Sequence, residues 1–221
     1  MAWDTVWEDV FKARPWGKYP GEDLIRFVAS NFYGKHERNK IKLLEVGCAS
    51  GANLWYMGRE GFSVYGVEGS ETAAHIAQER LNSECPGWTG EVKVGDILKL
   101  PFAADTFDAV IDVAAVCCNS FEDSKAIYSE MARVCKRGGA FFSRTLASGC
   151  WGDGIGTKVG HNAWLATEGP LAGIGYCRYT ALDEIPELVN PFQISAVELL
   201  LRTMENRSRE IREWVITGKK P

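Results

Sequence analysis

Hydrophobic and polar positions follow two alternating patterns between residues 41 and 146. Short, continuous apolar runs bounded by glycine or charged residues predict buried strands. Between these runs, apolar residues recur every three or four positions, which is typical of one face of a helix. Strands that alternate with helices predict a parallel sheet that is covered on both faces. The expected strands are 41–46, 62–68, 91–95, 107–113 and 139–146, and the expected helices are 52–60, 71–81 and 122–136.

The last part of the chain departs from this alternation. Residues 192–201 and 210–217 have strand-like patterns and are separated by eight residues, so they predict an antiparallel hairpin at the edge of the sheet. The expected fold class is therefore α/β. We expect a Rossmann-like doubly wound sheet of about seven strands, mostly parallel, that ends in an antiparallel C-terminal hairpin.

The first 35 residues are rich in aromatic side chains. Trp3, Trp7 and Phe11 are spaced four residues apart and therefore share one face of an expected helix. Two interpretations fit this segment, residues 1–35. It is either an amphipathic helix that packs on the domain or an N-terminal helical lid over a pocket.

A glycine-rich segment, residues 147–179, follows the last expected parallel strand. Its part 149–176 contains eight glycines and shows no periodicity. A loop of this length inside a compact domain is usually functional, and the apolar Trp151, Trp164 and Leu165 argue against disorder. We therefore expect a substrate loop after the fifth strand. Because the chain has no internal repeat and no hydrophilic linker, residues 1–221 are expected to form one domain.

The charge balance and the cysteine pattern exclude several classes of protein. Lys and Arg number 25 against 29 Asp and Glu, a net charge of −4, which argues against nucleic acid as a partner. The seven cysteines contain no C-x-x-C pair and the three histidines are scattered, so neither a disulfide framework nor a zinc site is expected. The N-terminus is acidic and no apolar run approaches about 18 residues, so we expect a cytoplasmic protein with no membrane partner.

The strongest chemical signal is the segment 44–53, LEVGCASGAN, where a strand runs through a turn into a helix. Gly47 and Gly51 let a ligand approach the backbone closely, and the helix N-terminus offers unpaired N–H groups. A dinucleotide fingerprint would require glycine where this chain has Ala49 and Ala52. A nicotinamide-dependent oxidoreductase is therefore disfavoured.

Two acids follow the next two expected strands. Glu68 lies 17 residues after Gly51, at the rim of the sheet where a carboxylate accepts hydrogen bonds from both ribose hydroxyls. Asp96 falls on the same rim, where its carboxylate accepts from an exocyclic amino group and the N–H of Ile97 donates to a ring nitrogen. The alternatives are a solvated acid at position 68 and a turn cap at position 96.

The order of these motifs over residues 41–146 resembles that of the class I S-adenosylmethionine-dependent methyltransferases. More narrowly, the chain is similar to small bacterial members associated with polysaccharide and sugar-nucleotide biosynthesis. This narrower resemblance is carried by segments 16–22 (WGKYPGE), 112–123 (DVAAVCCNSFED), 168–173 (EGPLAG) and 212–219. Many such proteins have a histidine near the positions of Val116 and Cys117, and this chain has none there.

The resemblance implies S-adenosylmethionine as the cofactor, S-adenosylhomocysteine as the product and a set of cofactor-binding residues. Tyr19 reaches the methionine carboxylate from the N-terminal segment, and the residues expected at the methionine end are Glu45, Gly47, Ala49, Gly51 and Asn53. Glu68, Gly69 and Ser70 are expected at the ribose, and Asp96 and Ile97 at the adenine. The backbone of Asp112, Val113 and Ala114 is expected to pass beneath the sulfonium.

The acceptor side is predicted from fewer signals. Arg144, and Arg178 with Tyr179, present groups suited to an anionic acceptor, the alternative being structural ion pairs. His161, beside Asn162 and Trp164 in the glycine-rich segment, is the candidate general base; the alternatives are a substrate contact or an exposed side chain. Trp164 is a candidate substrate contact. No metal is expected, because Thr145 and Leu146 stand where catechol-type relatives place acidic or amide ligands.

The sequence thus predicts methyl transfer to a small molecule, most plausibly to a hydroxyl of a sugar or sugar nucleotide. Transfer to nitrogen or to a phosphorus-bound oxygen stays open as an alternative. A different class of protein, a catalytically silent methyltransferase-like binding subunit, also stays open. The oligomeric state is expected to be monomer or homodimer.

Overall fold

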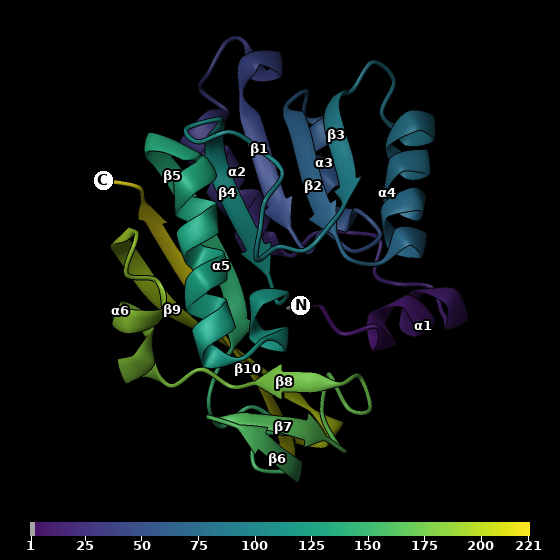
Figure 1. Ribbon diagram of the computed structural model, residues 1–221, viewed down its shortest axis with the longest axis vertical. Coiled ribbons are helices and arrows are strands. Elements are labelled where there is room, and N and C mark those ends of the chain that lie inside the picture. The colour runs from purple at the N-terminus through teal and green to yellow at the C-terminus, as the bar shows by residue number, and fades with distance from the viewer. Residues whose placement is uncertain (1–2) are drawn as a thin grey trace.

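The computed structural model describes residues 3–221 and has a central seven-stranded sheet with helices on both faces (Figure 1). The strand order is β3-β2-β1-β4-β5-β10-β9. The first five strands are parallel, and β10 runs antiparallel to both of its neighbours. The strands are β1 (Lys42–Val46), β2 (Ser63–Glu68), β3 (Thr89–Val94), β4 (Phe107–Val113), β5 (Cys135–Leu146), β9 (Gln193–Met204) and β10 (Arg209–Lys219). The expected Rossmann-like fold is confirmed.

The helices divide between the two faces of the sheet. They are α1 (Val6–Ala13), α2 (Glu22–Phe32), α3 (Ala52–Arg59), α4 (Glu71–Glu84), α5 (Phe121–Val134) and α6 (Ile185–Leu188). Short 3-10 turns are η1 (Arg38–Lys40), η2 (Val116–Cys118), η3 (Leu182–Glu184) and η4 (Glu205–Arg207).

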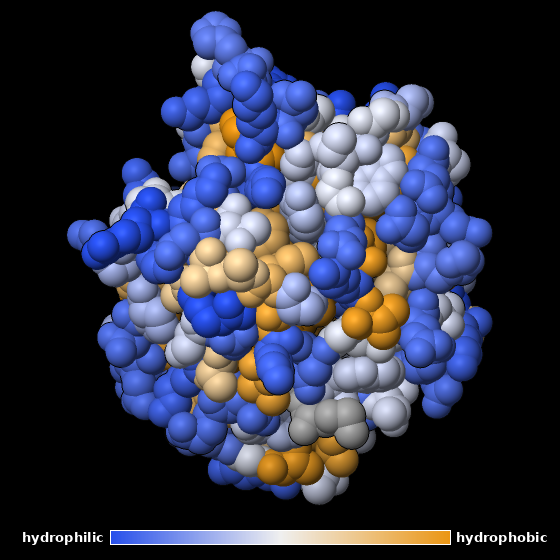
Figure 2. Space-filling view, turned by 45° about the horizontal axis from the view of Figure 1, so that its top comes forward, coloured by the Kyte–Doolittle hydropathy of each residue, from blue (hydrophilic) through white to orange (hydrophobic). Residues whose placement is uncertain are grey.

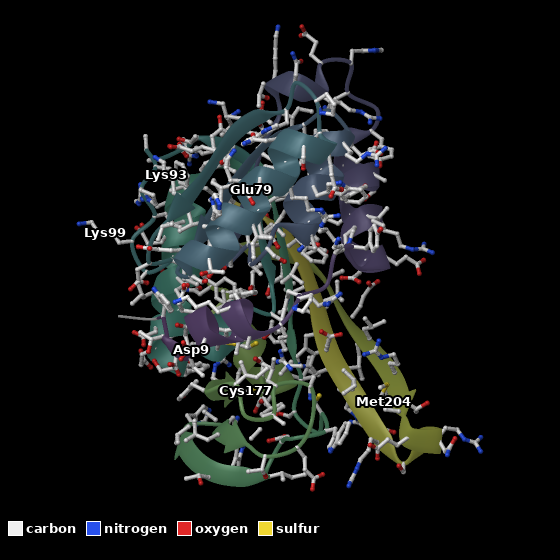
Figure 3. The ribbon with its side chains drawn as sticks, turned by 90° about the vertical axis from the view of Figure 1, so that its right-hand side faces the viewer. Asp9, Glu79, Lys93, Lys99, Cys177 and Met204 are labelled. Atoms are coloured by element: carbon white, nitrogen blue, oxygen red, sulfur yellow. The ribbon has the colours of Figure 1, made fainter. Side chains whose placement is uncertain are left out.

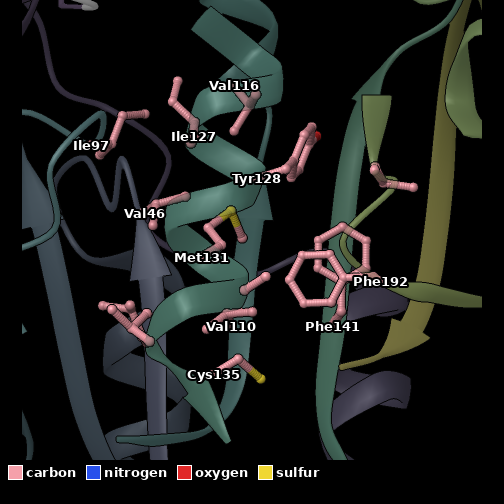
Figure 4. Close-up of a cluster of buried hydrophobic side chains, with 14 of the residues drawn as sticks. Val46, Ile97, Val110, Val116, Ile127, Tyr128, Met131, Cys135, Phe141 and Phe192 are labelled. Atoms are coloured by element: carbon pink, nitrogen blue, oxygen red, sulfur yellow. The ribbon is translucent and has the colours of Figure 1, made fainter. Parts of the chain in front are cut away.

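Two hydrophobic cores sandwich the sheet because successive strand residues point to opposite faces. Leu44 of β1 packs in the core with α5 and α6, whereas its neighbour Leu43 packs in the core with α2, α3 and α4. Figure 4 shows the first of these cores, in which Phe141 of β5 stacks on Phe192 with ring centroids 4.1 Å apart. Burial on both faces explains why the central strands are continuous apolar runs in the sequence.

The glycine-rich segment contains regular structure that the sequence did not predict. It forms a separate antiparallel sheet of β6 (Gly156–Gly160), β7 (Ala163–Ala166) and β8 (Tyr176–Arg178), which lies below the main sheet in Figure 1. The expected loop after the fifth strand therefore contains three short strands. Strands of three to five residues interrupted by glycine are too short to show an alternating pattern.

Both ends of the chain also differ in detail from the prediction. The N-terminal segment holds two helices, α1 and α2, separated by a stretch that contains Pro20, and Trp3 precedes the first of them. The C-terminal hairpin is present, but its strands are longer than expected and η4 makes its turn shorter. Residues 202–209 are exposed on both strand faces, so no alternation marks them as strand. The surface in Figure 2 is largely hydrophilic, with hydrophobic residues in separate patches.

Gly51 fixes the close packing of α3 on α4 and offers a test of the fold. Its φ is +78°, and a Cβ there would lie 2.8 Å from the Cβ and 3.1 Å from the Cα of Ala77. Gly87 has a similar φ of +76° but open space around it. We predict that Gly51→Ala lowers the free energy of unfolding by about 2–5 kcal/mol, the sum of left-handed strain and overpacking. Gly87→Ala, the matched control, should lose only the strain, about 1–2 kcal/mol.

Thermal unfolding followed by circular dichroism measures both variants. The Gly51 variant should melt clearly below the Gly87 variant, since about 1 kcal/mol shifts Tm by ~2–4 °C in a domain of this size. Equal melting temperatures for the two variants would contradict the close approach of α3 and α4.

Candidate functional site

A pocket of about 250 Å³ opens at the carboxyl ends of the parallel strands. Its walls come from three parts of the chain: the turns after β1, β2 and β3, the segment after β4 with the end of β5, and the N-terminal segment. The first group is Gly47, Ala49, Glu68, Gly69, Gly95 and Ile97. The second is Val113, Ala114, Ala115, Cys118, Asn119 and Arg144, joined by Leu171, and the third is Trp3, Asp4, Trp7, Phe11 and Trp16.

The turn after β1 is held to the end of β2 by backbone hydrogen bonds. The N–H groups of Gly47 and Cys48 both donate to the carbonyl of Val67, over 2.8 and 3.3 Å. Ala49 has a left-handed φ of +47° and donates its N–H to Oε2 of Glu68 over 2.8 Å. A non-glycine residue in this conformation carries strain, and the Glu68 carboxylate is the contact that holds it there.

Glu68 therefore has a fixed orientation at the pocket wall. Its Oε1 accepts from the N–H of Ser70 over 2.9 Å, while Oε2 accepts from Ala49. The side chain is 8% exposed, and burial raises its pKa although the backbone N–H groups act in the opposite direction. The N–H of Gly69 also acts on this carboxylate, and a carboxylate with about four lone-pair sites retains capacity for a further donor from a ligand.

Two further carboxyl groups lie buried just behind the pocket. Glu45 of β1 accepts from Nδ2 of Asn53 over 2.5 Å, and its Oε2 is buried without a hydrogen-bond partner in the described part of the chain. Burial raises the pKa of Glu45 to about 8, and the negative charges of Asp112 and Glu68 also raise it. Asp112 of β4 is likewise fully buried, and its pKa is raised by burial.

Asp112 supports the segment after β4. It accepts from the N–H groups of Ala115 and Val116, both over 3.1 Å, and from the hydroxyls of Ser143 and Tyr128 over 2.7 and 3.1 Å. These bonds hold the pocket wall at Ala114, Ala115 and Cys118. Together, Glu45, Glu68 and Asp112 place three carboxyl groups at the ends of β1, β2 and β4, and burial raises the pKa of each, so that Glu45 keeps its proton at neutral pH. We call these three residues the acidic rim.

The N-terminal segment forms an aromatic roof, defined by Trp3, Trp7, Phe11 and Trp16. The rings of Trp7, Phe11 and Trp16 contact one another with centroids 5.5–6.0 Å apart. Trp3 lies against Gly69, where a Cβ would approach its indole to 2.6 Å. Figure 3 shows α1 lying between α4 and the small sheet. The position of the roof fits the lid interpretation of this segment.

Glu8 connects the aromatic roof to the N-terminus of α4 by hydrogen bonds. Its carboxylate accepts from the hydroxyls of Ser70 and Thr72 over 2.5 and 2.6 Å and from the N–H of Thr72 over 3.3 Å. The hydrogen bond from Ser70, then that from Thr72, lowers the pKa of Glu8 to about 2. A carboxylate at a helix N-terminus is also favoured by the helix dipole. We call this contact the latch.

Seven of the predicted cofactor residues line the pocket and seven do not. Those that line it are Gly47, Ala49, Glu68, Gly69, Ile97, Val113 and Ala114. Glu45, Asn53 and Asp112 lie behind the wall as described, and Gly51 packs on α4. Ser70 caps α4, and Asp96 accepts from the N–H of Leu98. Tyr19, which we expected at the methionine carboxylate, does not line the pocket: it is 72% exposed, and its ring packs on Trp55.

The predicted acceptor residues are mostly elsewhere. Arg144 lines the pocket, but Asp23 and Glu213 pair with it at 3.3 and 3.1 Å, so its charge is already balanced. Arg178 and Tyr179 are completely buried and do not line the pocket, so the structure does not bring these two predicted substrate contacts to it. The guanidinium of Arg178 donates instead to the hydroxyls of Thr180 and Ser124, over 3.0 and 3.2 Å.

The structure also places His161 and Trp164 away from this pocket. His161 pairs with Glu184 and lines a second cavity of about 820 Å³ between the start of α5 and the small sheet. Trp164 packs against a buried cluster that includes Cys117, Leu146 and Cys177, with Lys158 over its ring, and it is not among the residues that line the pocket. Neither is positioned by the structure for the role of base or substrate contact at the main pocket, because the small sheet holds both away from it.

Asn119 is a pocket residue that the sequence reasoning missed. It is 6% exposed and donates Nδ2 to the carbonyls of Ala115 and Val116, over 3.2 and 3.3 Å. Its Oδ1 is buried and has no hydrogen-bond partner among residues 3–221. A buried carbonyl oxygen without a partner is rare and favours a ligand that donates. No pattern in the sequence marks this position, since it follows the 3-10 turn η2.

Comparison with known proteins agrees with this geometry. Residues 44–143 match the methyltransferase domain family. The methyltransferase GfsG of Streptomyces halstedii is 25% identical over 189 residues, covering 78% of this chain and 67% of its own length. A ubiquinone biosynthesis O-methyltransferase of Sinorhizobium medicae is 25% identical over 206 residues, covering 89% of this chain and 79% of its own. The structure of a SAM-dependent methyltransferase from Methanosarcina mazei superposes with a TM-score of 0.70 at 20% identity, covering 86% of this chain and 97% of its own.

Glu45 gives this site a pH dependence that can be measured. Between about pH 4.5 and 8 the folded chain keeps a proton on Glu45 that the unfolded chain has released, so stability falls as pH rises. We predict that Glu45→Gln, whose side chain cannot titrate, makes the free energy of unfolding fall less steeply with pH in this range, by up to ~1.4 kcal/mol per pH unit. Urea unfolding at several pH values measures it, and Glu79→Gln on the exposed face of α4 is the control. Parallel stability profiles for wild type and the Glu45 variant would contradict the assignment.

The latch gives a second prediction. Glu8→Gln removes the charge at the start of α4, so the roof should open more often and trypsin should cleave within residues 12–18 several-fold faster. Asp9→Asn removes a neighbouring exposed charge that makes no contact with α4 and should leave the cleavage rate unchanged. Because the pKa of Glu8 is lowered, the latch is complete above about pH 4.5 and is lost as pH falls through about 2. Equal cleavage of both variants and wild type would show that Glu8 does not hold the roof.

Two observations concern residues 3–221 as a whole. No helix in this part of the chain is long and apolar enough to span a membrane. Within the same residues, no group of three or more His, Cys, Asp or Glu side chains is arranged to hold a metal ion. The family match over residues 44–143, the fold and the pocket at the strand ends all point the same way: this part of the chain is similar to S-adenosylmethionine-dependent methyltransferases.

Proposed function

We propose that the chain transfers the methyl group of S-adenosylmethionine to an O–H or N–H group of a small, largely apolar acceptor bound beneath the aromatic roof. The observation that carries this proposal is the composition of the pocket. It combines the Glu68 carboxyl group and the glycine-bearing turn with aromatic rings and the unpartnered Oδ1 of Asn119.

The first half of the pocket supports the binding of the cofactor. We assign Glu68 to the ribose hydroxyls, because its carboxylate lines the pocket, is oriented by backbone N–H groups and retains capacity for a further donor. The turn at Gly47 and Ala49 is assigned to the methionine end, and Gly95 and Ile97 to the adenine. The cofactor carries positive charge on its sulfonium and ammonium groups, and a positive charge nearby would favour the ionised form of Glu68 and Asp112.

The residues of the second half align the acceptor. When bound, the cofactor would supply an activated methyl carbon: the carbon–sulfur bond breaks as this carbon bonds to the acceptor oxygen or nitrogen, S-adenosylhomocysteine leaves, and the proton of the O–H or N–H group passes to solvent. Asn119 accepts a hydrogen bond from the acceptor through Oδ1 and thereby orients the attacking atom. The roof excludes water from the reacting atoms, which strengthens the electrostatic interactions inside the pocket.

The pocket walls bear on the class of acceptor. Trp7, Phe11 and Leu171 present apolar surface to the pocket. The positive charge of Arg144 is balanced by its ion pairs with Asp23 and Glu213, so this side chain does not favour an anionic acceptor. This disfavours phosphorus-bound oxygen and charged sugar nucleotides. A neutral sugar hydroxyl, which the sequence predicted, remains the second candidate because sugar rings also stack on aromatic side chains.

Paired variants test this division of the pocket. Glu68→Gln should weaken binding of S-adenosylmethionine by roughly 10- to 100-fold, through loss of charge-assisted hydrogen bonds. Asn119→Leu should leave that affinity unchanged and lower kcat/KM for the acceptor by roughly tenfold. Quenching of tryptophan fluorescence measures the first effect, and transfer of labelled methyl to a panel of phenols, amines, neutral sugars and sugar phosphates measures the second.

The panel also decides between the functions. Transfer of labelled methyl to phenols or amines supports the proposal. Transfer to sugars alone would show that the acceptor is a sugar hydroxyl and not a largely apolar molecule. Binding of cofactor without label in any acceptor would favour a catalytically silent subunit. Loss of cofactor affinity in the Asn119 variant would contradict its place at the acceptor end.

A further inference from the structure

The outer strand of the C-terminal hairpin, β9, is an unusual edge. It is 12 residues long and hydrogen-bonds to β10 on one side only within residues 3–221. A long apolar edge strand is a template for pairing with another chain, and proteins usually protect such edges with lysine, proline or short length. β9 contains neither lysine nor proline. The opposite edge strand, β3, is half as long and carries Glu91 and Lys93.

The side chains of β9 are apolar where nothing covers them. Leu199, Leu200 and Leu201 are 45%, 42% and 44% exposed, and Met204 is 38% exposed. Successive residues point to opposite faces of a strand, so these leucines leave apolar surface on both faces. Other exposed large hydrophobic residues of the described chain lie singly, which is ordinary for a protein surface. Figure 3 shows this end of the hairpin, with Met204 labelled, extending beyond the rest of the sheet.

Two charged residues flank the leucines symmetrically. Glu198 precedes them and Arg202 follows them, so the segment 198–202 is Glu-Leu-Leu-Leu-Arg. Both charged side chains are exposed, and neither has an ion-pair partner in the described part of the chain. They cannot pair with each other, because four residues along a strand separate them by about 13 Å.

The segment 198–202 can pair with a second, antiparallel copy of itself so that apolar residues face apolar residues and opposite charges face each other. If a second copy of β9 runs antiparallel with Leu200 on the two-fold axis, Leu200 faces its counterpart and Leu199 faces Leu201. In the same register, Glu198 lies opposite the second copy's Arg202, and the pair occurs twice by symmetry. Directly opposed residues on antiparallel strands interact, and opposite charges there are stabilising. A two-fold contact of this kind closes on itself without leaving a free edge.

We propose that β9 is a dimerisation edge, at which two copies of the chain join their seven-stranded sheets through antiparallel β9–β9 pairing centred on Leu200. The pairing covers the three exposed leucines and gives Glu198 and Arg202 the partners they lack in one chain. The dimer leaves the methyl-transfer pocket of each copy intact, since no residue of β9 lines it.

Charge exchange tests both the dimer and its register. Sedimentation equilibrium of the full chain at micromolar concentration should give twice the 24.5 kDa of one chain. Glu198→Arg places like charges opposite each other at two points and should raise the dimer dissociation constant about tenfold or more, as should Arg202→Glu. The double variant E198R/R202E restores opposite charges and should restore the dimer. Glu91→Arg, on the other edge strand, is the control and should not change the mass.

Melting temperature and tryptophan quenching by S-adenosylmethionine show that each variant remains folded and binds cofactor. Recovery of the dimer in the double variant alone, with all variants folded, is the result that supports the proposal. A wild-type chain that sediments as a monomer would overturn it. A dimer that the single reversals leave intact would also overturn it, because the interface would then lie elsewhere or in another register.

Discussion

The burial of three carboxyl groups at the ends of β1, β2 and β4 is the constraint on which the rest of the site depends. Burying a carboxylate is costly unless hydrogen bonds compensate for the lost water. Glu68 and Asp112 meet this requirement with backbone N–H groups from the turns that follow their neighbouring or own strands. The same bonds that compensate the charge also fix the conformation of the turns. The acidic rim therefore shapes the wall of the pocket, and a positively charged ligand beside it would favour the ionised form of its carboxyl groups.

The N-terminal segment completes the site by covering this rim. Its aromatic residues bring apolar surface over the strand ends, and the latch at Glu8 connects α1 to the N-terminus of α4, the helix that begins directly after Glu68. The roof and the rim are thus joined through Ser70, whose N–H donates to Glu68 and whose hydroxyl donates to Glu8. Closure of the roof is in this way mechanically connected to the carboxylate assigned to the ribose.

The sequence predicted those parts of the fold and of the site that depend on the local pattern of apolar residues and glycines along the chain. The parallel strands are buried on both faces and appear as apolar runs, and the order of strand, turn and helix placed Gly47 and Glu68 at the pocket. The mispredicted positions depend on how distant segments pack. Tyr19 lies outside the pocket because its segment packs on α3. Arg178 is buried because a short strand of the small sheet, with no sequence pattern of its own, packs against η2 and α5.

Asn119 is a pocket residue that the sequence did not predict, again because its role depends on three-dimensional packing. Nothing about an asparagine after a cysteine pair distinguishes a pocket residue from an ordinary cap, and only the structure reveals that its Oδ1 is buried without a partner. The acceptor class is therefore argued from packing and hydrogen bonding in three dimensions. The cofactor, by contrast, was predictable from the order of motifs along the chain.

Binding of S-adenosylmethionine at the acidic rim and the glycine-bearing turn underlies every role proposed for the pocket residues. Calorimetric titration of the ligand-free, folded chain with S-adenosylmethionine measures this binding. We expect saturable binding with one molecule of cofactor per chain. A folded chain that releases no heat and shows no saturation over the accessible concentrations would contradict it.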